Sequence, residues 1–310
     1  MALTFLQNRI SKSRTLLPVM ALYAVAVWVS CGLLTQNLWL QFACFVVSSY
    51  LMVELNNSNA LIRIYSRMVS CSFIVMMCMA TFLLQSDGSM FLSICMVTMF
   101  ITIFMTYQDQ LSMGWTFYTF LSLGIASLVD VKILYFAPAL WIAMFFHLKS
   151  LTLRTFFSSL FGMLCPYWFL SLYLIYTADG TPAVEHFSKF IDFCKIADFS
   201  QVPTAALVSM GYVLTLSVIG IVHYLRNRIN DKTRTRMLYN TFILIDIVAI
   251  IFMVLQPQSY ATLLTVMIIT TSPLIAHFIA LTHTKVTNIT FIAIVVVALV
   301  LTLTNILQLI

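Results

Sequence analysis

The segment TFILIDIVAIIF, from Thr241 to Phe252, is apolar at most positions and contains one carboxylate, Asp246. It belongs to an apolar run over residues 237–255, which as a helix is long enough to cross roughly 30 Å of hydrocarbon. Similar runs recur along the whole chain, in which 62% of the residues are hydrophobic and 8% are charged. Soluble domains have about 25% charged residues, so the sequence predicts a helical integral membrane protein.

The sequence pattern argues against the other membrane architecture. A transmembrane β-barrel needs alternating strands of about ten residues, and no such alternation occurs here. We therefore predict an all-α fold, a polytopic integral membrane bundle of about eleven transmembrane helices in a single domain over residues 1–310. The predicted spans are 16–34, 38–54, 68–84, 90–106, 113–129, 133–147, 155–177, 204–225, 237–255, 259–281 and 287–309.

The basic residues predict the orientation. An odd number of spans places the two ends of the chain on opposite sides, and Lys and Arg concentrate in short cytoplasmic loops. With the N-terminus inside, only Lys132, Lys189 and Lys195 of the 16 basic residues lie outside. The sequence therefore predicts a membrane protein with a cytoplasmic N-terminus and a C-terminus on the opposite side of the membrane. The basic residues placed inside are Arg9, Lys12, Arg14, Arg63, Arg67, Lys149, Arg154, Arg226, Arg228, Lys232, Arg234, Arg236 and Lys285.

Two internal segments concentrate these cations, ELNNSNALIRIYSR at 54–67 and RNRINDKTRTR at 226–236. Each basic residue near an anionic membrane surface contributes about 1 kcal/mol of attraction, so lipid headgroups are the expected partners and the net charge of +6 does not indicate nucleic acid. An arginine pair in the first segment could alternatively hold a phosphate. The predicted headgroup contacts are Arg63, Arg67, Arg226, Arg228, Lys232, Arg234 and Arg236.

The longest external segment, residues 178–203, has the pattern of a helix that lies in the outer membrane interface. Thr181 followed by Pro182 is typical of a helix start, and Pro203 is expected to end the segment before the next span. Apolar residues recur at helical spacing and are expected to face the acyl chains. These residues are Phe187, Phe190, Ile191 and Cys194.

Polar residues on the external side are candidates for acid–base chemistry on a membrane-bound substrate. A carboxylate and a histidine beside an interfacial helix have the chemistry of a general acid or base. The alternative is that such a helix needs charged residues on its wet face without any catalysis. The candidate catalytic residues are Asp130, Lys132, Glu185 and His186.

The seven cysteines do not predict a metal site or a disulfide framework. Six of them lie in or near predicted spans, only Cys194 lies in an external segment, and no CxxC occurs. Cysteines in this setting pack as small apolar side chains. We therefore predict no metal and no cofactor, with membrane lipids as partners.

The predicted spans 113–129 and 133–147 are short and form a hairpin that turns at Asp130–Lys132. Both are at or below the minimum length for crossing the hydrocarbon, so they are expected to meet the surface in a depression or to thin the bilayer locally. Small residues on the first arm favour close packing against another helix. They are Gly124, Ala126 and Ser127.

The sequence of this hairpin resembles that of known proteins. Gly124-Ile-Ala-Ser-Leu, followed by Lys132, Pro138 and Trp141, resembles the hairpin of C-type membrane glycosyltransferases. With the following LRTFFSSLFGMLCPYWFLSLYLIY, the chain is similar over about residues 50–180 to an uncharacterised polytopic inner-membrane family of Bacteroidetes. C-type glycosyltransferases move sugars from polyprenyl-phosphate donors at the outer face. The resemblance therefore implies a bacterial inner-membrane protein, with its C-terminus in the periplasm, in the neighbourhood of such substrates, and it does not by itself imply an activity. Those enzymes carry a catalytic acid in a large first external loop, whereas the first external segment here is TQN, so no catalytic residue is carried over.

Asp246 is expected about nine residues from the inner end of its span, roughly 13 Å deep. The next span contains Thr270, Thr271, Ser272 and Pro273 at the same depth, and His277 about one turn nearer the cytoplasm. Pro273 removes an amide donor and leaves a carbonyl without its helical partner. The sequence therefore predicts a polar site at the midplane, which either binds an ion or substrate or joins the helices by hydrogen bonds.

Three functions remain open from the sequence. The resemblance favours an envelope-biogenesis protein that handles lipid-linked glycan at the outer face. The midplane carboxylate indicates a proton- or cation-coupled secondary transporter that uses Asp246, although no internal repeat is detectable. The third is a non-catalytic scaffold subunit, for which unbroken helices without cavities are expected.

Overall fold

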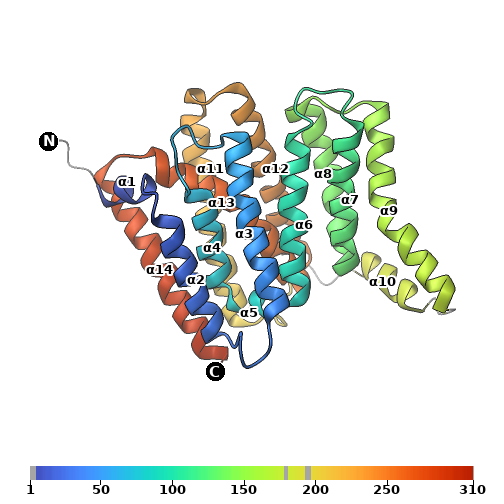
Figure 1. The fold of residues 1–310 in the computed structure, drawn as a ribbon, viewed down its shortest axis with the longest axis horizontal. Helices are drawn as coiled ribbons and strands as arrows, with labels where there is room; N and C mark the ends of the chain where they lie inside the picture. Colours follow the sequence, from blue (N-terminus) through green and yellow to red (C-terminus); the bar gives the residue numbers. More distant parts are fainter. Residues whose placement is uncertain (1–4, 178–180, 193–196, 310) are drawn as a thin grey trace.

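The computed structural model describes residues 5–177, 181–192 and 197–309, and every regular element in this part of the chain is a helix (Figure 1). The predicted all-α fold class is confirmed. The α-helices are α1 (Leu6–Ser11), α2 (Leu16–Ser30), α3 (Trp39–Asn59), α4 (Met68–Met79), α5 (Thr81–Leu84), α6 (Asp87–Phe104), α7 (Met113–Val129), α8 (Ala137–Ile142), α9 (Leu153–Thr177), α10 (Thr181–Ile191), α11 (Thr204–Asn227), α12 (Thr233–Leu255), α13 (Tyr260–Leu281) and α14 (Lys285–Leu309). The 3₁₀ segments are η1 (Val131–Phe136), η3 (Arg228–Asn230) and η4 (Pro257–Ser259), and η2 (Ala143–Leu148) is a π-helix.

Helical structure covers most of each predicted span. Among the described residues, seven helical stretches are long and apolar enough to cross a membrane by length and composition. Three shorter apolar helices are α2, α4 and α7, and the predicted span 38–54 lies within α3. The seven long stretches are Asp87–Phe104, Val131–Leu148, Leu153–Leu172, Thr204–Asn230, Thr233–Leu255, Pro257–Leu281 and Lys285–Gln308.

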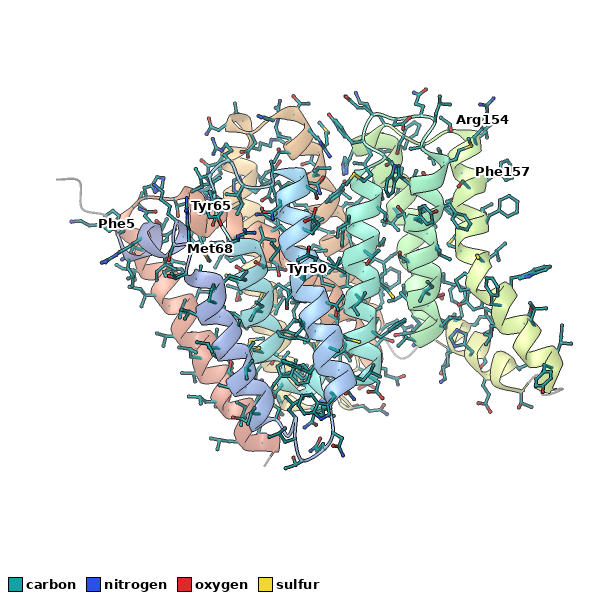
Figure 2. All side chains as sticks on the ribbon, viewed as in Figure 1. Phe5, Tyr50, Tyr65, Met68, Arg154 and Phe157 are labelled. Atoms are coloured by element: carbon teal, nitrogen blue, oxygen red, sulfur yellow. The ribbon has the colours of Figure 1, made fainter. Side chains whose placement is uncertain are left out.

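Helix α13 is the centre of the bundle. Every residue from Leu263 to Ala280 is buried, and the helix packs against α4, α6, α11 and α12. Helices α9 and α14 lie at the two ends of the molecule (Figure 1), and large apolar side chains such as Phe157 on α9 point outward (Figure 2). This arrangement buries one helix completely and leaves apolar faces at the ends, as expected where hydrocarbon is the solvent.

The connecting segments sort onto two faces. Helix α1 and the connections α3–α4, α8–α9, α11–α12 and α13–α14 lie on one face, which we call the basic face because these segments carry most of the Lys and Arg residues (Figure 1). The connections α2–α3, α7–η1 and α12–α13 lie on the opposite face, where α14 also ends (Figure 1). The grouping matches the predicted charge distribution, and assigning the basic face to the cytoplasm stays a prediction.

The hairpin after α7 is present, but its second arm differs from the expectation. The side chain of Asp130 accepts a hydrogen bond from the Lys132 amide at 3.0 Å and so caps η1. The arm begins at Val131 rather than 133 and runs through η1, α8 and η2 over 18 residues. Because a 3₁₀-helix rises about 2.0 Å per residue instead of 1.5 Å, η1 makes this arm longer than the short α-helix predicted.

The external helix is shorter than its sequence pattern suggested. Helix α10 has Thr181 as its first residue and ends at Ile191, while Cys194 and Lys195 lie outside the described residues. Phe190 does not face outward: its ring stacks on Tyr135 of η1 at 4.5 Å between centroids, and the Tyr135 hydroxyl donates to the Phe190 carbonyl at 2.5 Å. The hairpin therefore holds α10 in place.

Helices α7 and α9 approach each other so closely that only glycine fits at two positions. A Cβ added to Gly124 would lie 2.8 Å from the Met163 carbonyl oxygen, and one added to Gly162 would lie 2.5 Å from the Phe117 carbonyl oxygen. The predicted small-residue packing at Gly124 is confirmed, and Gly162 supplies the matching surface on α9.

We expect Gly162→Ala to push α7 and α9 apart and to lower the free energy of unfolding by about 1–3 kcal/mol, as for other overpacked interfaces. Gly211→Ala in α11 is the control, because a Cβ there meets nothing within 4 Å. Thermal unfolding of the detergent-solubilised variants measures the effect. Equal stability of the two variants would contradict the close approach.

Candidate functional site

Asp246 lies in the middle of α12 and is completely buried. Its carboxylate accepts hydrogen bonds from three hydroxyl groups on two other helices. Thr270 and Thr271 of α13 donate to Oδ1 at 2.6 and 3.4 Å, and Ser217 of α11 donates to Oδ2. The carboxylate therefore joins α11, α12 and α13 at one level, and we call these four residues the Asp246 site.

The predicted midplane cluster is confirmed in part. Thr270 and Thr271 contact Asp246, whereas the Ser272 hydroxyl donates to the Ile268 carbonyl of its own helix at 2.5 Å. Successive helical residues are about 100° apart, so all three hydroxyls of the run cannot face the same carboxylate. His277 also belongs elsewhere, because its ring contacts Asp231.

Ser217 was missed by the sequence reasoning. It is one hydroxyl in the apolar run LTLSVIG of α11, and its contact with Asp246 spans 29 residues. Short connections predict that consecutive helices are neighbours, but they do not predict which face of α11 meets α12 and α13. Its span also contains Ser209 and Thr215, so the sequence carried no signal that distinguished Ser217.

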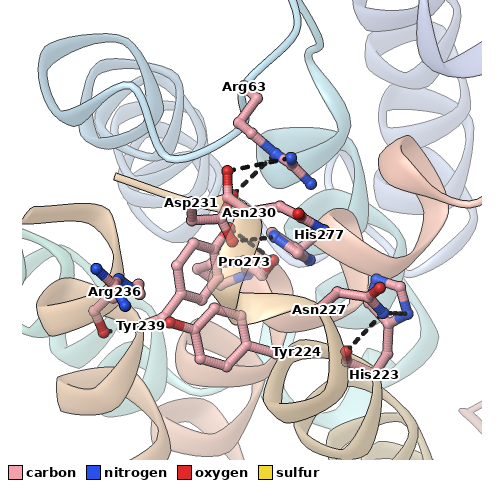
Figure 3. A network of polar contacts seen from close by, with 10 residues as sticks. All are labelled: Arg63, His223, Tyr224, Asn227, Asn230, Asp231, Arg236, Tyr239, Pro273 and His277. Carbon is pink, nitrogen blue, oxygen red and sulfur yellow. Dashed lines mark hydrogen bonds and ion pairs between the residues drawn. The ribbon is translucent and has the colours of Figure 1, made fainter. Parts of the chain in front are cut away.

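A second polar cluster lies where α13 approaches the basic face. Asp231, in the α11–α12 connection, lies between Arg63 and His277 (Figure 3). The distances are 2.9 Å from Arg63 Nε to Asp231 Oδ1 and 3.1 Å from His277 Nε2 to Asp231 Oδ2. The side chains of Asp231 and His277 are fully buried, and that of Arg63 is 38% exposed. These three residues form the Asp231 cluster.

Aromatic rings enclose this cluster. Tyr224 of α11 and Tyr239 of α12 stack at 4.7 Å between ring centroids, and the His277 ring lies edge-on to both (Figure 3). The Tyr239 hydroxyl donates to the Pro273 carbonyl of α13 at 3.4 Å. The rings exclude water from the acid–histidine pair, which strengthens the interaction between them.

The structure adds to the role predicted for Arg63. Its predicted contact with lipid headgroups stays a prediction, and its guanidinium also binds Asp231 and donates to the Asn230 carbonyl at 3.2 Å. Arg234 donates to the Asn59 side chain at 3.1 Å while it stays largely exposed. The signal for Asp231 was its position as the single acid in RNRINDKTRTR.

The other predicted headgroup residues remain at the surface of the basic face. Arg67 donates to the Tyr65 hydroxyl at 3.1 Å, and Arg236 donates to the Thr233 hydroxyl at 3.2 Å. The exposed members of the set are Arg226, Arg228 and Lys232.

Both polar centres depend on α13. Thr270 and His277 are seven residues apart, which is two turns or about 10 Å along the helix, so they lie on nearly the same side. Pro273 lies between them and provides no amide donor for the Ile269 carbonyl. One fully buried helix thus carries the partners of two buried carboxylates, with a weakened turn between them.

The four candidate catalytic residues do not form one site. Lys132 Nζ donates to Gln256 Oε1 at 2.9 Å beside Asp130, around a cavity of about 10 Å³ that has room for roughly one water molecule. His186 Nε2 lies 3.5 Å from the Tyr167 hydroxyl, which is hydrogen-bonded to Ser127 at 2.7 Å. Glu185 is exposed on α10.

A larger depression lies nearby on the same face. It has a volume of about 280 Å³ and is lined in part by Gln41, Asp87 and Val129. The Gln41 amide donates to the Asp87 carboxylate. Because Val129 directly precedes Asp130, the depression adjoins the turn of the hairpin.

The described residues contain no group of three or more His, Cys, Asp or Glu side chains that could hold a metal ion. The cysteines in the described part of the chain are free thiols, and most are buried. Comparison of the chain with known protein families, curated proteins and solved structures finds no match.

We expect Asp231→Ala to lower the free energy of unfolding by about 3–5 kcal/mol, because it leaves the buried His277 without its acceptor. Arg63→Gln is expected to lower it by no more than about 1 kcal/mol, since partly exposed ion pairs contribute little. Chemical or thermal unfolding of both variants in the same detergent provides the comparison. Similar losses for the two variants would show that Asp231 is not the centre of the cluster.

Proposed function

We propose that this chain is a proton-coupled membrane transporter in which Asp246 takes up and releases the proton. The observation that carries the proposal is the fully buried carboxylate at the centre of α12, hydrogen-bonded by hydroxyls from α11 and α13. Ionisable groups at this depth in transmembrane bundles mark ion pathways and proton relays.

Stabilisation of the helix packing alone accounts poorly for the residue. Placing Asp at the centre of a membrane helix costs about 2.5–3.5 kcal/mol. Interhelical hydrogen bonds in membranes contribute about 0.6 kcal/mol each, so three of them contribute about 2 kcal/mol. An apolar side chain at position 246 would join the three helices without this deficit, which favours a chemical role for the carboxyl group.

The surroundings of Thr270 suit both protonation states of Asp246. When the carboxylate is ionised, the Thr270 hydroxyl donates to Oδ1 at 2.6 Å. When it is protonated, Asp246 can donate to the threonine oxygen, and the hydroxyl can donate instead to the carbonyls of Val266 or Met267 at 3.1 and 3.0 Å. Rotation of one hydroxyl therefore keeps every group bonded as the proton arrives and leaves.

The same contacts favour a proton over a metal cation. A bound cation needs several oxygen lone pairs that point toward one open position. Here both oxygens of the carboxylate already accept hydroxyl donors on two sides. A proton requires no additional space.

A transport cycle also needs access to the Asp246 site from the two faces. Pro273 weakens α13 between this site and the Asp231 cluster, which leads to the partly exposed Arg63. We propose that this turn of α13 opens toward the basic face. We further propose that the eleven predicted spans all cross a bacterial inner membrane, with the basic face in the cytoplasm.

Handling of lipid-linked glycan is the second candidate function. The depression of about 280 Å³ at Asp87 favours it, because a carboxylate and a carboxamide line a concavity beside the hairpin turn. Its volume is near the lower limit of small-molecule sites. The resemblance of residues 113–147 to C-type membrane glycosyltransferases is consistent with this candidate. A scaffold subunit is the third, and the cavities of about 280 Å³ argue against it.

The test of the first proposal is infrared spectroscopy of the reconstituted protein during pH titration in H₂O and D₂O. We expect a protonated carboxyl band that titrates and shifts on deuteration, and that is absent from Asp246→Asn. Thr270→Val should move the titration midpoint while the fold is kept, because it removes the switching hydroxyl. Asp87→Asn serves as the matched control and should retain the band.

The rate of proton flux across a membrane tests the transport activity directly. Proteoliposomes with an entrapped pH indicator should acidify after an external acid pulse when a bacterial solute extract is supplied with it, and Asp246→Asn should reduce that rate to the protein-free level. Two results together would refute the proposal. In the first, Asp246 keeps one protonation state over the whole pH range in which the protein is folded. In the second, Asp246→Asn leaves the proton flux unchanged.

For the second candidate, Asp130→Asn and Glu185→Gln are expected to abolish transfer of a polyprenyl-phosphate-linked sugar in membranes while leaving circular dichroism unchanged. Asp109→Asn, in the α6–α7 connection on the other face, is the control. Retention of full transfer activity by both variants excludes a catalytic role for either carboxylate.

A further inference from the structure

An apolar groove separates α14 from the centre of the bundle. It has a volume of about 280 Å³, and α1, α2, α4, α11, α13 and α14 all contribute to its wall. On its inner side Cys71, Leu216 and Ile275 are almost completely buried, whereas Val295 and Val296 of α14 are 39% and 52% exposed. The groove therefore extends from the packed core to the lipid-facing side of α14.

The groove wall offers almost no hydrogen-bonding capacity. The hydroxyl of Tyr23 is bonded to Thr302 Oγ1 at 2.8 Å, and that of Tyr212 donates to the Ile294 carbonyl at 2.9 Å. Ser72 is the other hydroxyl in the wall. An apolar cavity of roughly 150 Å³ already stays dry and binds benzene, so a groove of this size and polarity fits hydrocarbon and does not fit a sugar or an ion.

Helix α1 covers the end of the groove at the basic face. Gln7 is buried, and its amide nitrogen donates to the Ile279 carbonyl and to the Thr282 hydroxyl, both at 2.6 Å. This anchoring places Leu6 and Ile10 in the groove wall. Because α1 is tied to α13, it forms a fixed rim at the depth of the lipid headgroups.

The rim is cationic without any compensating acid of its own. Arg9, Lys12 and Arg14 are exposed and adjoin Ile10 and Leu16 of the wall. No Asp or Glu occurs in residues 1–53 or 247–310, which include α1, α2, α13 and α14. Cations at the rim and hydrocarbon in the groove are complementary to the two parts of one anionic phospholipid.

We propose that the groove binds one acyl chain of an anionic phospholipid, whose headgroup lies against Lys12 and Arg14. The bound lipid fills the space between α14 and the core, and it joins α1, α2 and α14 to α4, α11 and α13. This site is separate from the Asp246 site and does not depend on the function proposed for it.

Native mass spectrometry of the full chain, released from nanodiscs with equal phosphatidylglycerol and phosphatidylcholine, tests the proposal. We expect one retained phosphatidylglycerol in the unmodified protein. Val295→Trp fills the open side of the groove and should reduce its occupancy at least about tenfold. Val297→Trp is the matched control, because residue 297 is 43% exposed and lies outside the groove wall.

Further experiments distinguish binding of the lipid headgroup from binding of its acyl chain. The double variant Lys12→Gln/Arg14→Gln should retain one lipid but lose the preference for phosphatidylglycerol. Inorganic phosphate and glycerophosphoglycerol, which lack acyl chains, should not displace the lipid. If Val295→Trp fails to fold, Ser72→Leu fills the groove from α4 and should give the same loss. Full retention of lipid in the filled variants, or displacement by the chain-free headgroup, would overturn the proposal.

Discussion

The hydrogen bonding of polar groups inside an apolar helical bundle is the constraint on which this structure depends. No water is present at the centre of a bilayer, so each buried polar side chain needs a partner from the protein. Most polar side chains of helix α13 meet this constraint: Thr265 and Ser272 donate to carbonyls of their own helix, Thr270 and Thr271 to Asp246, and His277 Nε2 to Asp231, while His277 Nδ1 has no partner among the described residues. The positions of these partners set how α11, α12 and the α11–α12 connection pack around α13.

The two buried carboxylates differ in what surrounds them, and this difference separates their roles. Asp231 has a cation and an imidazole within 3.1 Å, and rings enclose it. The ion pair between Asp231 and Arg63 fixes the carboxylate in one position. Asp246 has only neutral hydroxyls, and at least Thr270 can exchange its acceptor. A site that neutral groups satisfy in two ways can change its protonation state without leaving a buried polar group without a hydrogen-bond partner, and that property suits a proton carrier.

The peripheral helices pack differently from the helices around α13. Helices α7 and α9 touch through Gly124 and Gly162, whereas the groove lies between α14 and α13, and α14 is held to α4 and α11 by hydrogen bonds from Asn305. In lipid there is no hydrophobic force that closes such a gap, since acyl chains are as apolar as the side chains. A peripheral helix can therefore be held through a bound lipid as well as through direct packing.

The sequence by itself determined that the chain is all-helical and apolar, where its helices lie, how its cations divide between two faces, and that Asp246 has Thr270 and Thr271 near it. Those features depend on composition, on periodicity and on neighbours in the chain. Only the tertiary structure decided that Ser217 completes the Asp246 site, that Arg63 and His277 share Asp231, that Phe190 packs on Tyr135, and that a groove lies beside α14. Each of these depends on the rotation of helices distant in sequence, and apolar helices in hydrocarbon carry little pattern that specifies which face meets which neighbour.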